Sequence, residues 1–234
     1  MKGKEAYRSQ PLTSLLTETE TASLRALAKP VRVVPPQTLY HEGDPCRHAY
    51  IMEDGLLMLE RLASDGRRQV LAFVYPGDFM GIDMAGKHMV SAVAIEPCRL
   101  SQVRLSDLND LARRHPAIDT ALKRVTHGIL GFMLDQVCVL GRMTARQRMA
   151  FFFLHMADRQ KCTGDSPEIT LAMTRADIAD FLGLRIETAI RTLSAMKRDG
   201  LIDSVSLNVM RIRDMDTLVD LTDLSAHAWR NADP

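Results

Sequence analysis

The chain has 234 residues, long for one domain and comfortable for two, and its 46% hydrophobic and 25% charged residues are typical of a soluble globular protein. It has no apolar run long enough to span a membrane and no apolar core of a secretory signal, which argues against a membrane partner and export and predicts a cytoplasmic protein. It has no CxxC pair, which argues against structural zinc and a disulfide framework. The net charge of +1 is uneven, because residues 142–213 carry 12 Lys and Arg against 8 Asp and Glu, a modest excess that is compatible with a nucleic-acid partner.

The first half of the chain changes from a helical to a β-rich pattern. Residues 12–29 predict a short helix, in which Thr17 and Glu20 form a T-x-x-E capping box. From about residue 31 to 105, short β-rich runs alternate with glycines at positions 43, 55, 66 and 77, and "SDGRRQ" indicates a hairpin. Many short strands at even spacing predict a sandwich or a jelly-roll barrel.

Residues 106–141 return to a helical pattern, with a short helix to His115 and a long helix that Pro116 opens. Apolar residues in the long helix recur at steps of four and three with one polar interruption, which predicts a coiled-coil seam between two copies of the chain. An amphipathic helix packed on its own domain is the alternative. The predicted seam consists of Ile118, Leu122, Val125, Ile129, Phe132, Gln136 and Val139.

The C-terminal part predicts two short helices followed by a hairpin. A helix capped by Thr144 comes first, then a loop with a short strand, and then the stretch "ADIADFLGLRIETAIRTLSAMKRDGLI". Thr174 caps the first helix of that stretch, Gly183 ends it, and the second helix runs from about Arg185 to Asp199. Two short strands around Asn208 form the hairpin, and the polar tail from about residue 219 is expected to be partly disordered. This order predicts a winged helix-turn-helix, whose second helix enters the DNA major groove.

The second helix has one apolar face and one mixed face. Ala189, Leu193 and Met196 recur at steps of four and three and are expected to face the core. A surface ion pair between Glu187 and Arg191 would explain the two charges on the opposite face, but it does not explain isoleucines beside them. Arginine binds guanine, glutamate accepts from cytosine N4, and a hydrocarbon contacts a thymine methyl. The face predicted to read DNA contains Ile186, Glu187, Ile190, Arg191 and Ser194.

The order of these parts resembles the Crp/Fnr superfamily of bacterial transcription regulators over roughly residues 12–218. The stretch "RADIADFLGLRIETAIRTLSAMKRDGLI" is similar to the family's DNA-binding motif, and "EGD", "PGD", "GID" and "SAVAIEPC" resemble its barrel signatures. The short loop "GIDMAGKHMVSA" is most similar to the FixK-type branch. The resemblance implies an α+β protein with a cyclic-nucleotide-binding-like β-roll (jelly roll) at 12–115, a dimerisation helix at 116–141 and a winged helix-turn-helix at 142–218.

The resemblance also implies a homodimeric regulator, expected to be an activator that contacts RNA polymerase. Its double-stranded DNA site is expected to be a pseudo-palindrome with T-G-A-containing half-sites, read by Glu187 and Arg191. Ile190 stands where FixK-type relatives usually have serine, and Arg185 replaces the usual Ser/Thr cap while remaining able to reach a phosphate. Thr174 and Arg175, at the start of the first helix, complete the predicted DNA-binding set.

The resemblance further predicts which effectors the β-roll does not bind. The cAMP-binding members of the family have a glutamate and an arginine at the positions of Ile82 and Val90. The phosphate of a bound cAMP would therefore be buried here without a positive charge beside it. No cysteine precedes Cys46, which excludes the N-terminal iron–sulfur cluster of other members. Thr174 replaces the redox-sensitive cysteine of some FixK-type proteins. We therefore predict no bound cofactor.

Two alternatives remain at this point. A haem-dependent gas sensor would need an axial ligand, and His88 is the best single candidate, although a turn histidine is the simpler and preferred explanation. A cupin-like metalloenzyme would use Cys46, His48 and Glu53, but the sequence lacks the two histidines and the later ligand that such sites usually have. We therefore expect a DNA-binding protein and not an enzyme.

Overall fold

The computed structural model describes residues 11–82, 86–164 and 166–222. The chain divides into two compact units, with the boundary between Phe132 and Met133. This boundary lies inside the long helix α3 (Pro116–Arg142), so the helix contributes to both units.

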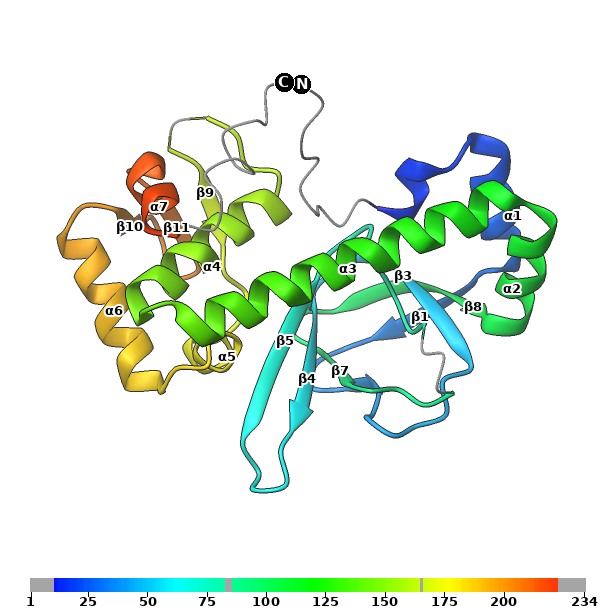
Figure 1. The fold of residues 1–234 in the computed structure, drawn as a ribbon, viewed down its shortest axis with the longest axis horizontal. Coiled ribbons are helices and arrows are strands. Elements are labelled where there is room, and N and C mark those ends of the chain that lie inside the picture. Colours follow the sequence, from blue (N-terminus) through cyan, green and yellow to red (C-terminus); the bar gives the residue numbers. More distant parts are fainter. Residues whose placement is uncertain (1–10, 83–85, 165, 223–234) are drawn as a thin grey trace. The chain divides into compact units, whose positions relative to one another are not determined.

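The N-terminal unit contains two four-stranded antiparallel sheets, with the strand orders β1-β8-β3-β6 and β2-β7-β4-β5 (Figure 1). This is the predicted jelly-roll type of β-roll. The β4–β5 pair is the hairpin expected around Gly66, whose φ is +79°. The strands are β1 Lys29–Val33, β2 Thr38–Tyr40, β3 His48–Asp54, β4 Leu57–Leu62, β5 Arg68–Val74, β6 Phe79–Met80, β7 Ser91–Ala94 and β8 Cys98–Arg104.

Helices cover one side of the β-roll. They are the 3₁₀ helix η1 Leu12–Leu15, α1 Glu18–Leu27, α2 Leu105–Arg114 and the first half of α3. The single helix expected at 12–29 is therefore two helices, because the capping box of Thr17 and Glu20 starts a new helix at Glu18. One apolar core joins these helices to the strands and includes Leu24, Ile51 and Val103, and a second core includes Tyr50, Leu57 and Leu100.

The C-terminal unit is a winged helix-turn-helix, as the sequence predicts. Thr144 and Gln147 form a capping box at the start of α4, and Thr174 and Asp177 form another at the start of α5. The wing is a three-stranded antiparallel sheet in the order β10-β11-β9. The elements after α3 are α4 Ala145–Arg159, β9 Glu168–Thr170, α5 Arg175–Phe181, α6 Ile186–Arg198, β10 Ile202–Ser204, β11 Val209–Ile212 and α7 Met215–Thr222 (Figure 1).

The helix α7 is absent from the sequence prediction. It packs against α4 and buries Leu218 and Val219, so the expected disordered tail does not begin at residue 219. An eight-residue helix without a glycine or proline signal is difficult to recognise, because its stability comes from packing and not from its own length. The rest of the predicted tail lies outside the described residues.

Candidate nucleic-acid interface

The second helix of the reading motif, α6, has the two faces that its sequence predicts. Ala189, Leu193 and Met196 are buried, with at most 8% of each side chain exposed. The other face carries the exposed residues Ile186, Glu187, Ile190, Arg191 and Ser194. Ile186 and Ile190 retain 40% and 47% exposure, so two branched hydrocarbons lie in solvent beside two opposite charges. Large apolar side chains exposed next to charged groups are typical of a binding surface.

The two charged residues of this face are one helical turn apart. No ion pair or hydrogen bond joins the side chains of Glu187 and Arg191 in the part of the chain that the structure describes. Both therefore keep their full hydrogen-bonding capacity for a ligand.

The turn before α6 is built without a side-chain cap on the second helix. Gly183 has φ +58°, and the N–H of Leu184 donates to the carbonyl of Ala179 at 2.9 Å. Arg185 occupies the N-cap position with extended backbone, and its side chain makes no capping bond. Arg185 is exposed and directly precedes the first backbone N–H groups of α6, where a phosphate is favoured.

Thr174 and Arg175 belong to the start of α5. The Thr174 Oγ1 donates to the Asp177 carboxylate at 2.6 Å and accepts from the Asp177 N–H at 3.1 Å. The Thr174 hydroxyl is therefore engaged in holding the helix end. Arg175 is half-buried, and burial lowers the pKa of its guanidinium from the ordinary value. Arg175 and Ile190 line the same small cavity between α5 and α6, so the structure brings these two predicted residues together.

Ion pairs hold the elements around α6. Arg146 on α4 pairs with Asp199 at the end of α6, and Arg211 on β11 pairs with Glu168 on β9 at 2.6 Å. The four side chains are 32–46% exposed to water, so each pair contributes little stability by itself. These contacts are absent from the sequence prediction, because residues 43 and 53 positions apart give no local signal.

Most residues of the predicted dimer seam on α3 are buried within their own chain. Ile118 and Val125 have 0% and 3% exposure and lie in the core of the N-terminal unit, and Leu122 packs against that core. Gln136 and Val139 are also buried, and Phe132 is half-buried. The seam residues therefore mostly face their own chain, as in the alternative interpretation, and only Ile129 is exposed, at 40%.

A different stripe of α3 is exposed and apolar. Leu130, Leu134 and Val137 are 54%, 58% and 68% exposed and follow steps of four and three, and the exposed Cys138 adjoins them. We call these four residues the outer stripe. A helix whose second face is apolar and exposed has hydrophobic surface left to bury against a partner.

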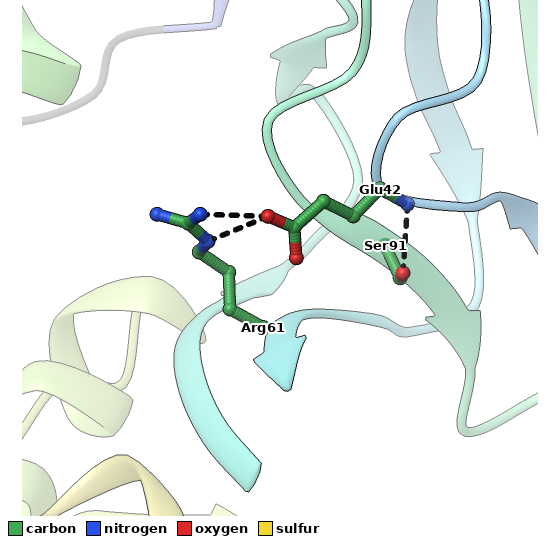
Figure 2. A network of polar contacts seen from close by, with 3 residues as sticks. All are labelled: Glu42, Arg61 and Ser91. Carbon is green, nitrogen blue, oxygen red and sulfur yellow. Dashed lines mark hydrogen bonds and ion pairs between the residues drawn. The ribbon is translucent and has the colours of Figure 1, made fainter. Parts of the chain in front are cut away.

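The β-roll position that binds a cyclic phosphate in nucleotide-binding relatives has internal contacts here. The backbone N–H of Glu42 donates to Ser91 Oγ at 2.9 Å, and Arg61 donates from Nε and Nη2 to Glu42 Oε1 at 3.0 and 2.7 Å (Figure 2). The neighbouring Val90 is a partly buried member of the apolar core. Ser91 thus already accepts a hydrogen bond from its own chain.

The residues that the sequence offered for the haem and metal alternatives have contacts within their own chain. His88 is only 6% exposed and stacks on Tyr40, which gives it a packing role inside the β-roll. Cys46 Sγ donates to the carbonyl of Gly81, and Glu53 accepts from Ser101 Oγ. In residues 11–82, 86–164 and 166–222, no three His, Cys, Asp or Glu side chains meet in a way that could hold a metal ion. Among the same residues, no helix has both the length and the apolar composition that crossing a membrane requires.

Comparisons with known proteins agree with this architecture. Residues 30–115 match the cyclic nucleotide-binding domain family and residues 147–221 match the Crp-like helix-turn-helix domain family. The chain is 35% identical to the nitrogen fixation regulation protein FixK of Azorhizobium caulinodans, over 82% of this chain and 79% of that protein. It is 32% identical to FixK of Bradyrhizobium diazoefficiens, over 84% of both proteins. The solved structure of FixK2 from Bradyrhizobium japonicum superimposes with a TM-score of 0.78 at 31% identity, covering 83% of this chain and 96% of that one.

The two family matches lie in the β-roll and in the helix-turn-helix, and the alignments to the FixK proteins cover about four fifths of this chain and of each relative. Their identity is high enough to establish common membership and not only a common fold. The chain belongs to the Crp/Fnr family of DNA-binding transcription regulators, and it is FixK-like.

Proposed function

We propose that this regulator binds, as a homodimer, a pseudo-palindromic DNA site whose half-sites contain T-G-A. The observation that carries the proposal is the outer face of α6, where Glu187 and Arg191 are exposed and unpaired among the described residues while Ile186 and Ile190 lie beside them. Water hydrates the two charges but gains nothing from the two exposed isoleucines, whereas the edges of base pairs offer partners for both kinds of side chain.

Each side chain of this face has a distinct role in the proposal. Arg191 donates two hydrogen bonds to guanine O6 and N7, and Glu187 accepts from the cytosine amino group. Ile190 offers only hydrocarbon and therefore favours a thymine methyl. Arg185, Arg175 and Ser194 contact phosphates, and these contacts position the helix without selecting a sequence.

The dimer in this proposal forms through the outer stripe of α3. Residues 12–115 act as the regulatory β-roll, residues 116–141 as the dimer helix and residues 142–218 as the DNA-binding domain. Two parallel copies of α3 bury Leu130, Leu134 and Val137 against their counterparts, which removes exposed apolar surface from water. A two-fold dimer of this kind places its two reading helices about one DNA turn apart.

We further propose that the protein is an activator that contacts RNA polymerase and does not bind cAMP. The relatives named as FixK are described as nitrogen fixation regulation proteins, and a relative from Rhodopseudomonas palustris, 30% identical, is named the transcriptional activatory protein AadR. Those names support regulation and activation. The partly buried Val90 and the Glu42–Ser91 hydrogen bond support the absence of a phosphate site.

Selection of binding sites from a random DNA pool tests the proposal. The enriched sites should contain an inverted repeat with T-G-A in each half, and the Arg191→Ala protein should lose its preference at one G·C pair. Enrichment of sites without an inverted repeat would contradict the dimeric part of the proposal. An unchanged base preference in Arg191→Ala would contradict the assignment of the reading face.

A further inference from the structure

Arg148 on α4 makes an unusual number of hydrogen bonds to the backbone. Its Nε donates to the carbonyl of Met143 at 2.9 Å, and its Nη2 donates to the carbonyl of Leu140 at 2.8 Å. Its Nη1 donates to the carbonyls of Leu182 and Gly183 at 2.9 and 3.2 Å. One guanidinium thus binds four carbonyl oxygens, and none of them belongs to α4 itself.

These carbonyls come from two helix ends. Leu140 lies in the last turn of α3 and Met143 follows that helix, whereas Leu182 is the C-cap of α5 and Gly183 forms the turn before α6. The last carbonyls of a helix have no partner within the helix and carry partial negative charge. A planar cation with five N–H groups satisfies acceptors on both sides at once, which a lysine ammonium on its flexible stem does not.

The turn before α6 also packs directly against the end of α3. A Cβ atom added at Gly183 would lie 3.1 Å from Leu140 Cδ2 and 3.4 Å from Arg148 Nη1, and the residue has φ +58°. All of these residues belong to the C-terminal unit. The end of α3 and the turn are therefore joined by close packing as well as by the guanidinium.

We propose that Arg148 is a positioning residue for DNA reading. It holds the turn that starts α6 against the end of the helix that carries the outer stripe, so each reading helix keeps one orientation relative to the dimer helix. The protein dimer therefore selects DNA by the bases of each half-site and also by the distance between the two half-sites. This inference rests on the proposed dimeric function, because the spacing of half-sites has meaning only for a dimer.

The test measures how strictly the protein selects half-site spacing. Arg148→Met removes the hydrogen bonds and keeps much of the side-chain length, and Arg148→Lys keeps the charge. Arg142→Met is the matched control, because Arg142 is exposed at the end of α3 and makes no side-chain hydrogen bond or ion pair among the described residues. Affinities are measured for inverted repeats with the selected spacing, with one or two base pairs added or removed, and for an isolated half-site.

We expect the wild type and Arg142→Met to lose about tenfold or more in affinity when the spacing changes by one base pair, comparable to a mismatched base. For Arg148→Met and Arg148→Lys, the loss should fall below about threefold, while the base preference within a half-site stays the same. A uniform loss of affinity at all spacings, with discrimination unchanged, would show a purely structural role and overturn the inference. A wild type that prefers no inverted repeat would instead contradict the proposed function.

Hydrogen exchange of the free protein tests the same inference without DNA. In Arg148→Met, the amides of Gly183 and Leu184 should exchange faster, whereas the amide of Ile212, which donates to Pro167 in the wing, should not change. Unchanged exchange at the turn in a folded Arg148→Met protein would mean that the guanidinium does not hold the turn, and the inference would be wrong.

Discussion

The imidazole of His88 stacks on the phenol ring of Tyr40 inside the β-roll, with ring centroids 3.6 Å apart and planes 8° apart. The backbone fixes His88 in this place, because its N–H donates to the carbonyl of Asp44 at 2.9 Å and its carbonyl accepts from the N–H of Gly43 at 2.8 Å. Tyr40 is also buried, its hydroxyl donates to Met80 Sδ, and burial raises the pKa of its phenol above the ordinary value. Aromatic side chains of this chain thus fill space next to the apolar core.

The first prediction concerns cyclic nucleotides. We expect about 1 mM cAMP to leave the melting temperature of the N-terminal unit unchanged, because Val90 offers no positive charge to a phosphate and Ser91 already accepts from Glu42. Thermal unfolding with and without cAMP measures this, with AMP as the control ligand. A calorimetric dissociation constant below about 100 μM, which is about −5.5 kcal/mol, would contradict the prediction.

The second prediction separates base reading from phosphate contact within the reading motif. Arg191→Ala should cost about 1–3 kcal/mol on the selected site and relax the preference at one G·C pair. Arg185→Ala should instead weaken binding to all sequences about equally and reduce the salt dependence by about one ion. Titrations at several salt concentrations, with the selected site and with a G·C-substituted site, measure both effects. If the two variants behave alike, the roles assigned to them are incorrect.

The third prediction separates the two faces of α3. Leu134→Lys should give a monomer at micromolar concentration, because it places a charge in the outer stripe, and tight DNA binding should be lost with the dimer. Val125→Lys should instead unfold the N-terminal unit, since Val125 is 3% exposed in its core. Ala117→Lys, at an exposed position of the first turn of α3, is the control and should remain dimeric. Sedimentation and thermal unfolding distinguish these outcomes, and a dimeric Leu134→Lys would exclude the outer stripe as the interface.

The fourth prediction concerns Thr174, whose hydroxyl is held by Asp177. Thr174→Ala should lower the free energy of unfolding of the C-terminal unit by about 1 kcal/mol, and Thr174→Ser should restore most of it. DNA affinity, corrected for the folded fraction, should change little in either variant. A loss of affinity of about tenfold at unchanged stability would assign Thr174 to a DNA contact and not to helix capping.

The fifth prediction concerns pH and His155 on α4. The rings of Phe151 and Phe181 lie parallel to the imidazole, at centroid distances of 5.9 and 6.2 Å. Burial, with a smaller contribution from the charge of Arg159, lowers the pKa of His155 to about 3. The folded protein therefore keeps His155 neutral, while the unfolded chain binds a proton near about pH 6.5.

This contribution to stability is fully present above about pH 6.5 and is lost as the pH falls from there toward the folded pKa. A single proton changes the free energy of unfolding by at most about 1.4 kcal/mol per pH unit, and the partial exposure of His155 makes the slope smaller than this limit. His155→Phe removes the titratable imidazole and keeps an aromatic ring at this position. The wild type should lose stability faster than this variant on acidification, as measured by denaturant unfolding at several pH values. A difference between the two proteins that does not vary with pH would contradict the prediction.

Several features were predictable from the sequence because the interactions behind them are local. The capping boxes of Thr17, Thr144 and Thr174 each join residues three positions apart, and all three occur in the structure. The periodicity that assigned Ala189 to the core side of α6 and Ile190 to its outer side is likewise a property of one helix. The family resemblance rested on the same short motifs, and the comparisons confirm it.

Only the tertiary structure decided which face of α3 packs against its own chain. Both faces of this helix have apolar residues at steps of four and three, so periodicity could not separate Val125 in the core from Leu134 in the outer stripe. It also decided the partners of Arg148, which contacts residues 34 and 35 positions away at the turn, and the packing of α7 against α4. The sequence by itself determined the starts of α1, α4 and α5 at their capping boxes and the composition of the reading face, because those depend on residues about one turn apart. The choice among several apolar faces and the pairing of distant groups depends on which surfaces the folded chain brings together, and only the three-dimensional structure contains that information.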